Sequence, residues 1–247
     1  MRMRKKPNID VRLGNCPGLI IENPEELKGQ WKARFPYPSL CLEIGCGKGR
    51  FTADTAAGNG DIFIVAVEKV IDAMIIAMER IRDRGIENVR FIDGDAKNLP
   101  LLFAEGELDR VYINFCDPWP KSRDAKFRLT APNFLRSYAS LLREDGEIHF
   151  KTDNRPLFDW SLEQMKNEGW ELRELTYDLH ANGVQGVMTD YEAKFYAQGL
   201  QINRVVAVRR PGTKTAADGL VPRLHDSALT DAKGYADSRK ANEERNK

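Results

Sequence analysis

The chain has few residues of the types that build metal centres or disulfide frameworks. Of its 247 residues, four are cysteine and three are histidine, and neither type is clustered. No C-x-x-C pair occurs, so neither a zinc site nor a disulfide framework is expected. Apolar runs approaching the roughly 18 residues that span a bilayer are also missing, and residues 1–6 are basic without the apolar core of a secretion signal. These absences predict a cytoplasmic protein with reduced thiols, no membrane segment and no metal.

A charge imbalance is missing as well. The 38 Lys and Arg residues nearly cancel the 37 Asp and Glu residues, which gives a formal net charge of +1. Bulk charge therefore gives no support to nucleic-acid binding, which would need a local basic patch. The hydrophobic fraction of 42% allows a sizeable core, and the length fits one large α/β domain with appendages.

Strand and helix patterns alternate along the chain. Apolar runs predict strands at residues 40–44, 62–67, 89–92, 108–115, 146–152, 170–177 and 200–208. Helical spacing appears at residues 24–35, 50–57, 70–84, 133–143, 157–167 and 191–198. This alternation predicts a mostly parallel sheet with helices on both faces, and the last two strands are close enough for one to run antiparallel at an edge. We expect residues 1–36 to form a basic arm and a short helix, residues 37–211 the main domain, and residues 212–247 a disordered tail.

Acidic residues end the predicted strands. In open α/β sheets ligands bind at the carboxyl ends of the strands, and this sequence places five acids there: Glu43, Glu68, Asp95, Asp117 and Asp153. The first strand is followed by a G-x-G-x-G turn, whereas a dinucleotide site needs G-x-G-x-x-G. An acid beside that turn is also poorly suited to a diphosphate. The pattern favours a cationic nucleoside without phosphate, S-adenosylmethionine.

Each donor-side residue has an expected contact. Gly45 and Gly47 would leave room for the methionine part of the donor, with Glu43 near its amino end. Glu68 would accept from the ribose hydroxyls and Asp95 from the adenine amino group. The alternative for Glu68 and Asp95 is that acids at strand ends cap the helix that follows.

Residues 114–128 combine an acid, an aromatic ring and a basic rim. Asp117 and Trp119 each precede a proline, which favours an extended backbone at both positions. Cations suited to an anionic backbone follow at Lys121, Arg123, Lys126 and Arg128. The set suggests chemistry on a base within a nucleic acid. The alternative is a tryptophan packed on a proline-rich loop with solvated cations beyond it.

Four motifs in this order resemble those of a known family. They are Leu-Glu-Ile-Gly-x-Gly-Lys-Gly at 42–49, Asn-Phe-x-Asp-Pro-Trp-Pro-Lys at 114–121, Lys-Thr-Asp at 151–153 and Thr-x-Tyr-Glu-x-Lys-Phe at 189–195. Together they resemble the bacterial tRNA (guanine-N7-)-methyltransferases, over about residues 2–208. The resemblance implies a Rossmann-like class I methyltransferase fold with seven strands. It also implies S-adenosylmethionine as donor, S-adenosylhomocysteine as product and a guanine of the tRNA variable loop as acceptor.

The resemblance also assigns site residues by position. The donor-binding acids would be Glu43, Glu68, Asp95 and Asp117, and the tRNA contacts would be Lys121, Asp153, Thr189, Asp190, Tyr191 and Glu192. The sequence departs from the family pattern at Cys116, where proline or serine is common. It departs again after Lys121, where the family is usually more basic.

The expected chemistry needs no general base, because guanine N7 carries a lone pair and no proton. Asp117 is the expected catalytic residue. It or Asp153 could hold guanine by accepting from the base's N1–H and N2 amino groups, and so position N7. We expect Cys116 and His149 to pack within the fold and His180 to touch RNA.

Other functions remain open from the sequence. An exocyclic-amine methyltransferase acting on another RNA base, a nicotinamide dehydrogenase and a non-catalytic tRNA-binding protein are the alternatives. The expected assembly is a monomer or a homodimer.

Overall fold

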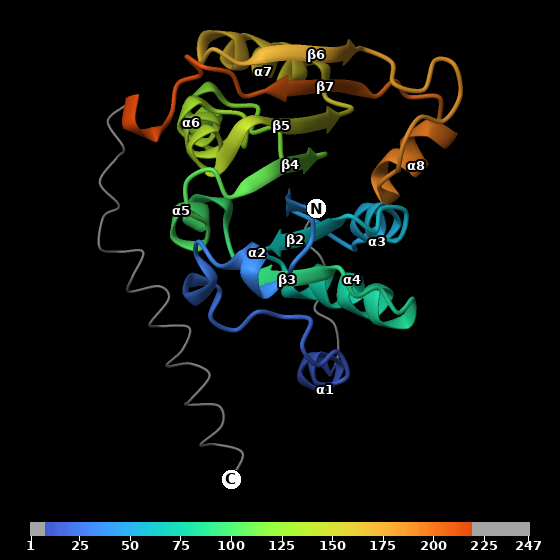
Figure 1. Ribbon diagram of the computed structural model, residues 1–247. Coiled ribbons are helices and arrows are strands. Elements are labelled where there is room, and N and C mark those ends of the chain that lie inside the picture. Colours follow the sequence, from blue (N-terminus) through green and yellow to red (C-terminus); the bar gives the residue numbers. More distant parts are fainter. Residues whose placement is uncertain (1–7, 219–247) are drawn as a thin grey trace.

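A seven-stranded sheet forms the middle layer of the protein, with strand order β3-β2-β1-β4-β5-β7-β6 (Figure 1). The computed structural model describes residues 8–218. The strands are β1 Ser39–Ile44, β2 Ile62–Glu68, β3 Val89–Asp93, β4 Leu108–Asn114, β5 Leu142–Thr152, β6 Glu171–Thr176 and β7 Asn203–Val208. The α-helices are α1 Ile9–Gly14, α2 Trp31–Arg34, α3 Arg50–Ala57, α4 Ile71–Asp83, α5 Leu99–Leu102, α6 Pro132–Leu141, α7 Arg155–Asn167 and α8 Asp190–Ala197. Short 3₁₀ turns lie at Pro24–Leu27, Ala96–Asn98, Ser122–Phe127 and Ala216–Asp218.

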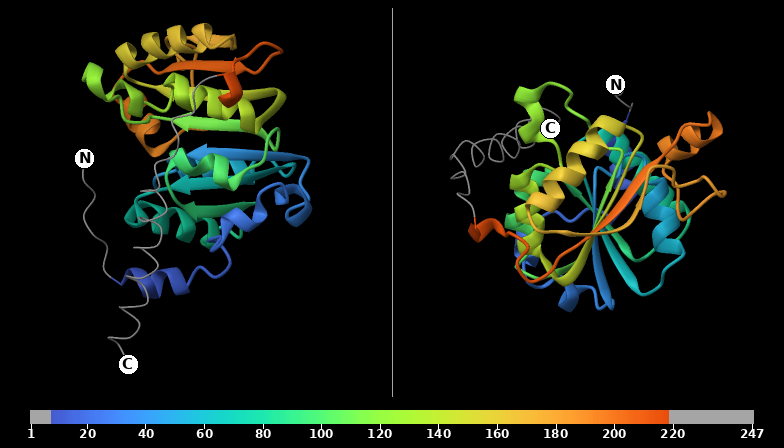
Figure 2. Two further views of the ribbon diagram at one scale, coloured as in Figure 1. Left: turned by 90° about the vertical axis from the view of Figure 1, so that its left-hand side faces the viewer. Right: turned by 90° about the horizontal axis from the view of Figure 1, so that it is seen from above.

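The alternation of side chains along the strands builds two cores, one on each face of the sheet. In β1, Leu40 and Leu42 enter the core shared with α5, α6 and α7, whereas Cys41 enters the core shared with α3 and α4. Successive residues of a strand point to opposite faces, so a fully buried strand reads as a continuous apolar run. Figure 2 shows the resulting helical layers on both sides of the sheet. The predicted mostly parallel sheet with two covered faces is confirmed.

The antiparallel strand of the sheet is β7, and its position differs from the prediction. It pairs antiparallel with β5 along Glu147–Thr152 and with β6 on its other side. The edge strand is therefore β6, and β7 lies inside the sheet. Burial explains this order: β7 is apolar and buried from Val205 to Val208, whereas most of β6 is exposed. A polar strand tolerates the sheet edge better than an apolar one.

The N-terminal segment contributes to the core as well as covering it. Trp31 is fully buried, and its indole Nε1 donates to the carbonyl of Leu102 at 2.9 Å. Farther towards the N-terminus, Arg12 of α1 forms an ion pair with Glu79 of α4 at 2.6 Å. The segment predicted as an arm is thus attached to both faces of the sheet.

Residues 212–218, predicted as the start of a disordered tail, pack against α6 and α7. The Thr213 side chain donates to the carbonyl of Gly169 at 3.1 Å, and the Ala216 amide donates to Ser140 Oγ at 3.0 Å. The remainder of the predicted tail, residues 219–247, lies outside the described residues. Within residues 8–218, no helix has the length and apolar character needed to cross a membrane.

Candidate active site at the carboxyl ends of the strands

The turn between β1 and α3 has the backbone conformation that only glycine adopts easily. Gly45, Gly47 and Gly49 have φ values of +75°, +56° and +71°. A Cβ at Gly49 would lie 2.4 Å from Cβ of Ala77, so this glycine lets α3 pack closely on α4. At Gly45 and Gly47 a Cβ would meet nothing within 4 Å. The turn is therefore packed against the protein at its third glycine and open at the first two.

Glu43 lies beneath this turn and is 1% exposed. Thr52 Oγ1 donates to its Oε2 at 2.5 Å, and Asn114 Nδ2 lies 3.5 Å from its Oε1. Burial raises the pKa of Glu43 to about 7, although both of these hydrogen bonds lower it. In this structure Glu43 is held by the protein's own side chains, which tie β1 to α3 and β4.

Glu68 and Asp95 both accept hydrogen bonds from the main chain. The two carboxylate oxygens of Glu68 accept from the amides of Gly47 and Val70, each at 2.9 Å. Asp95 accepts from the Lys97 amide at 3.1 Å, as the N-cap of a 3₁₀ turn. Asp95 therefore has the capping role considered for it, whereas the N-terminus of α4, which follows Glu68, has no side-chain cap. Glu68 also fixes the glycine turn, because Gly47 is one of its two partners.

Asp117 is exposed on the loop that follows β4. The loop bends sharply, with positive φ values of +53° at Phe115 and +43° at Trp119. The prediction that Trp119 is extended was therefore wrong. Arg128 supplies the physical reason: its guanidinium donates to the carbonyls of Pro118 and Trp119 at 3.0 Å each, and these bonds hold the bend.

The predicted basic rim divides into two kinds of residue. Lys121 precedes the 3₁₀ segment Ser122–Phe127, Arg123 and Lys126 lie on it, and all three side chains are exposed. Arg128 is instead occupied by the loop carbonyls and lies 4.4 Å from the ring centre of Trp160. Three of the four predicted cations are therefore available to an anionic partner.

The end of β5 presents a second exposed acid. Asp153 directly follows Thr152, and its neighbour Asn154 caps α7 by accepting from the Leu157 amide at 2.8 Å. Because β4 and β5 pair in parallel with Asn114 opposite Lys151, Asp117 and Asp153 follow the ends of adjacent strands. The two exposed carboxylates thus belong to the same edge of the sheet.

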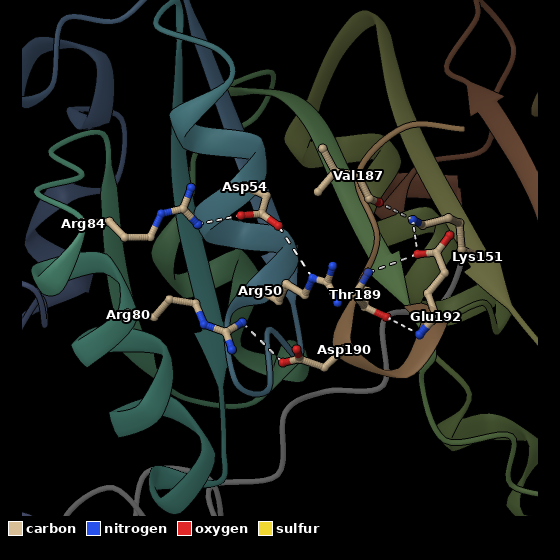
Figure 3. Close-up of polar contacts among 9 residues, drawn as sticks. All are labelled: Arg50, Asp54, Arg80, Arg84, Lys151, Val187, Thr189, Asp190 and Glu192. Atoms are coloured by element: carbon tan, nitrogen blue, oxygen red, sulfur yellow. Dashed lines mark hydrogen bonds and ion pairs between the residues drawn. The ribbon is translucent and has the colours of Figure 1, made fainter. Parts of the chain in front are cut away.

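The fourth motif begins α8 (Figure 3). Thr189 and Glu192 form a reciprocal capping box, in which each side chain accepts from the other residue's amide at 2.9 and 3.1 Å. Asp190 forms an ion pair with Arg80 of α4 at 3.3 Å, and Tyr191 is 62% exposed. Of the four residues predicted to contact tRNA here, Tyr191 is the most exposed, whereas Glu192 is fully buried.

Lys151 and His180 surround the buried Glu192. Lys151 Nζ lies 2.6 Å from Glu192 Oε2, and His180 Nε2 lies 3.0 Å from Glu192 Oε1. The expected contact of His180 with RNA does not fit this position, because the residue is 6% exposed. Burial lowers the pKa of Lys151, while Glu192 raises it.

Sequence reasoning missed this buried group, although the Lys-Thr-Asp motif at 151–153 marked one member. Two further residues with no predicted role are Thr52 and Asn114, both partners of Glu43. Cys116 and His149 take the packing roles expected of them. Burial raises the pKa of the Cys116 thiol to about 12, and His149 lies 2.8 Å from Glu147.

The geometry brings together a glycine turn with an open side, carboxylates at successive strand ends and an exposed basic segment. Such a set can hold a cationic nucleoside and, beside it, a base from an anionic polymer. Cys46 and Cys116, which follow β1 and β4, are not activated nucleophiles, because burial raises the pKa of each thiol.

Two solved methyltransferase structures share this fold. The 16S rRNA methyltransferase KamB superposes with a TM-score of 0.57 at 17% identity, covering 76% of this chain and 92% of that one. A mutant 16S rRNA (adenine(1408)-N(1))-methyltransferase from Catenulisporales acidiphilia gives 0.53 at 13% identity, covering 76% and 91%. The predicted α/β, Rossmann-like class I methyltransferase fold is confirmed.

Sequence comparison identifies the family. Residues 38–205 match a family model described as "Putative methyltransferase". A tRNA (guanine-N(7)-)-methyltransferase of Bacillus cytotoxicus is 43% identical over 213 residues, which cover 85% of this chain and 98% of that protein. The chain therefore belongs to the tRNA (guanine-N7-)-methyltransferase family.

Proposed function

We propose that the protein transfers a methyl group from S-adenosylmethionine to N7 of a guanine in the variable loop of tRNA. Its 43% identity to a tRNA (guanine-N(7)-)-methyltransferase over most of both chains supports this reaction. The structural observation that carries it is the pair of exposed carboxylates, Asp117 and Asp153, after adjacent strands beside the glycine turn. We further propose that residues 37–211 form the methyltransferase domain.

The residues at the turn fit a cationic, phosphate-free nucleoside. Gly45 and Gly47 are open on the side that a Cβ would fill, which leaves room for a ligand against the backbone. Glu43, Glu68, Asp95 and Asp117 would hold the donor as acceptors for its amino groups and ribose hydroxyls. When bound, S-adenosylmethionine supplies a methyl group on a positively charged sulfur, and the surrounding carboxylates suit that charge.

On the acceptor side, Asp117 and Asp153 would orient the guanine rather than take a proton from it. A carboxylate can accept from guanine N1–H and from its N2 amino group, and so orient N7 without removing a proton. The ring gains positive charge as N7 is methylated, and a nearby carboxylate favours that charge. Lys121 would contact a phosphate or the base, and Thr189, Asp190, Tyr191 and Glu192 would border the pocket.

The assay for this function is methyl transfer to unmodified bulk tRNA, followed by nucleoside mass spectrometry. Wild-type protein is expected to form 7-methylguanosine, and Asp117→Asn to lose it. Asp159→Asn is the matched control, because Asp159 is an exposed α7 acid with the same charge and a surface pair to Arg155.

The remaining outcomes distinguish the alternatives. A methylated exocyclic amine in the product would refute methylation at N7 and favour an exocyclic-amine methyltransferase. Binding of donor and tRNA with no methylated product would favour a non-catalytic tRNA-binding protein. We also propose that the protein acts in the cytoplasm as a monomer or homodimer and needs no metal, and activity in the presence of a chelator tests the last point.

A further inference from the structure

Lys151 lies between α3 and the loop that leads to the fourth motif at residues 189–195. It occupies the second-last position of β5, and its ammonium lies 5.1 Å from the ring centre of Phe51 in the first turn of α3. The β6–α8 loop, residues 177–189, passes over it (Figure 3). Its side chain is 8% exposed, so this charge is enclosed between the loop and the sheet.

Part of the β6–α8 loop has little apolar support, although Val187 packs against the core shared with α3 and α4. Residues 181–186 are all exposed. Beneath the loop is a cavity of about 400 Å³, whose lining includes Phe51, Asn114, Lys151, Gln185 and Val187. Contacts with a packed core therefore do not hold this part of the loop, and specific polar bonds must fix its conformation.

Lys151 supplies two of those bonds from the sheet. Its ammonium donates to the carbonyl of Val187 at 2.9 Å and to Glu192 Oε2 at 2.6 Å. The first bond holds the loop itself, and the second holds the first turn of α8. Because Glu192 is fully buried, its carboxylate depends on this partner for charge compensation.

His180 and the capping box extend the same network through the loop. The Gln185 amide donates to His180 Nδ1 at 3.1 Å, so the ring proton lies on Nε2 and points to Glu192 Oε1 at 3.0 Å. The Thr189 amide donates to Glu192 Oε2 at 3.1 Å. Three points of the loop are thus connected to one carboxylate, and Lys151 connects that carboxylate to β5.

Two other contacts of α8 with the domain are weaker or more exposed than this network. The Arg80–Asp190 ion pair joins side chains that are 29% and 39% exposed, and exposed pairs contribute little. Phe115 and Phe195 pack with ring centres 6.0 Å apart, which positions the helix but not the loop.

We propose that Lys151 is a positioning residue for tRNA methylation, which fixes the β6–α8 loop and the start of α8 against the end of β5. This assignment rests on the proposed function, because the loop it fixes carries the residues expected to border the guanine. Lys151 acts through Val187 and Glu192 and needs no contact with the donor or the base.

The test replaces Lys151 with methionine, which keeps the length of the side chain and removes its charge and its donors. Lys151→Met is expected to lower kcat/KM for tRNA by roughly 30-fold, since misplacement by about 1 Å costs on the order of 100-fold. Affinity for S-adenosylhomocysteine is expected to stay within about twofold of wild type, because the Lys151 ammonium donates to Val187 and Glu192 and not to a proposed donor-side carboxylate. Lys166→Met is the matched control, an exposed lysine at the end of α7 whose loss changes net charge equally.

Amide hydrogen exchange gives a readout that does not depend on methyl transfer. In Lys151→Met the amides of Gln185 and Thr189 are expected to exchange at least about tenfold faster. Lys151→Arg keeps the charge and its donors, and is expected to restore much of both the exchange protection and the activity. Wild-type exchange and wild-type kcat/KM in Lys151→Met would overturn the proposal.

Two further outcomes are distinguishable. If Lys151→Met fails to fold, the double variant Lys151→Met/Glu192→Gln removes the uncompensated buried carboxylate, and exchange at Gln185 decides the question: wild-type protection there overturns the proposal. If wild-type protein forms no 7-methylguanosine, the proposed function fails. The exchange measurement then still tests whether Lys151 fixes the loop.

Discussion

Replacing Gly49 by alanine tests the packing of the glycine turn between β1 and α3. Gly49 has a φ of +71°, and a Cβ there would lie 2.4 Å from Cβ and 2.8 Å from Cα of Ala77 in α4. The left-handed conformation costs a non-glycine residue roughly 1–2 kcal/mol, and forcing extra atoms into a packed region costs about 1–3 kcal/mol. The free energy of unfolding should therefore fall by roughly 2–5 kcal/mol.

Gly47→Ala is the matched comparison, because Gly47 also has a positive φ but has open space where its Cβ would lie. Its stability loss should be limited to the conformational cost of about 1–2 kcal/mol. At roughly 2–4 °C per kcal/mol for a domain of this size, Gly49→Ala should melt several degrees below Gly47→Ala. Binding of S-adenosylhomocysteine, measured by calorimetry, should weaken at least about tenfold in Gly47→Ala, as the added methyl group enters the proposed donor space. Equal melting temperatures, or wild-type donor affinity in Gly47→Ala, would refute the reasoning.

Three further substitutions address the acid beneath the turn and the loop after β4. The pKa of Glu43 in the folded protein is about 7, above its usual 4.5, so ionisation of Glu43 opposes folding. The free energy of unfolding of the wild type should therefore fall by roughly 3 kcal/mol between pH 4.5 and 7. Glu43→Gln should lack this loss when the two proteins are compared by thermal melting across that range. Arg128→Met should lower kcat with little change in donor affinity, because the bend after Asp117 loses its two carbonyl partners; steady-state kinetics giving a wild-type kcat would count against that role. Lys126→Ala should weaken tRNA binding and reduce the salt slope of log Kd by about one, measured by titration at several ionic strengths, while leaving kcat near wild type.

Local signals predicted the elements around the glycine turn well. The helix at residues 50–57 has the predicted bounds, and β1 and β2 differ from theirs by a single residue. The two strands are marked by contiguous apolar runs, and the start of the helix is marked by glycines whose conformational role is local. The acids at the ends of β1 to β5 follow from the same periodicity, because parallel strands place their carboxyl ends at one edge.

Features that depend on contacts between residues far apart in the sequence could not be predicted from local patterns. The backbone of Trp119 bends because Arg128 holds its carbonyl, which the prolines alone do not reveal. Glu192 is buried because Lys151, 41 positions earlier, compensates its charge, and no pattern within the fourth motif indicates this partner. The position of β7 inside the sheet likewise depends on pairing across the fold.

The placement of β6 and β7 side by side has a consequence for how the site can vary. Thr176 at the end of β6 pairs with Arg204 in β7, so the whole intervening segment, α8 included, leaves and re-enters the sheet at neighbouring points. Doubling the length of a loop whose ends are already adjacent adds only about 0.6 kcal/mol of closure entropy. Insertions at the exposed residues 181–186 are therefore expected to leave the pairing of β6 with β7 intact. The architecture lets the exposed part of this segment vary in length, while the bonds from Lys151 to Val187 and Glu192 require the rest of it to keep its position.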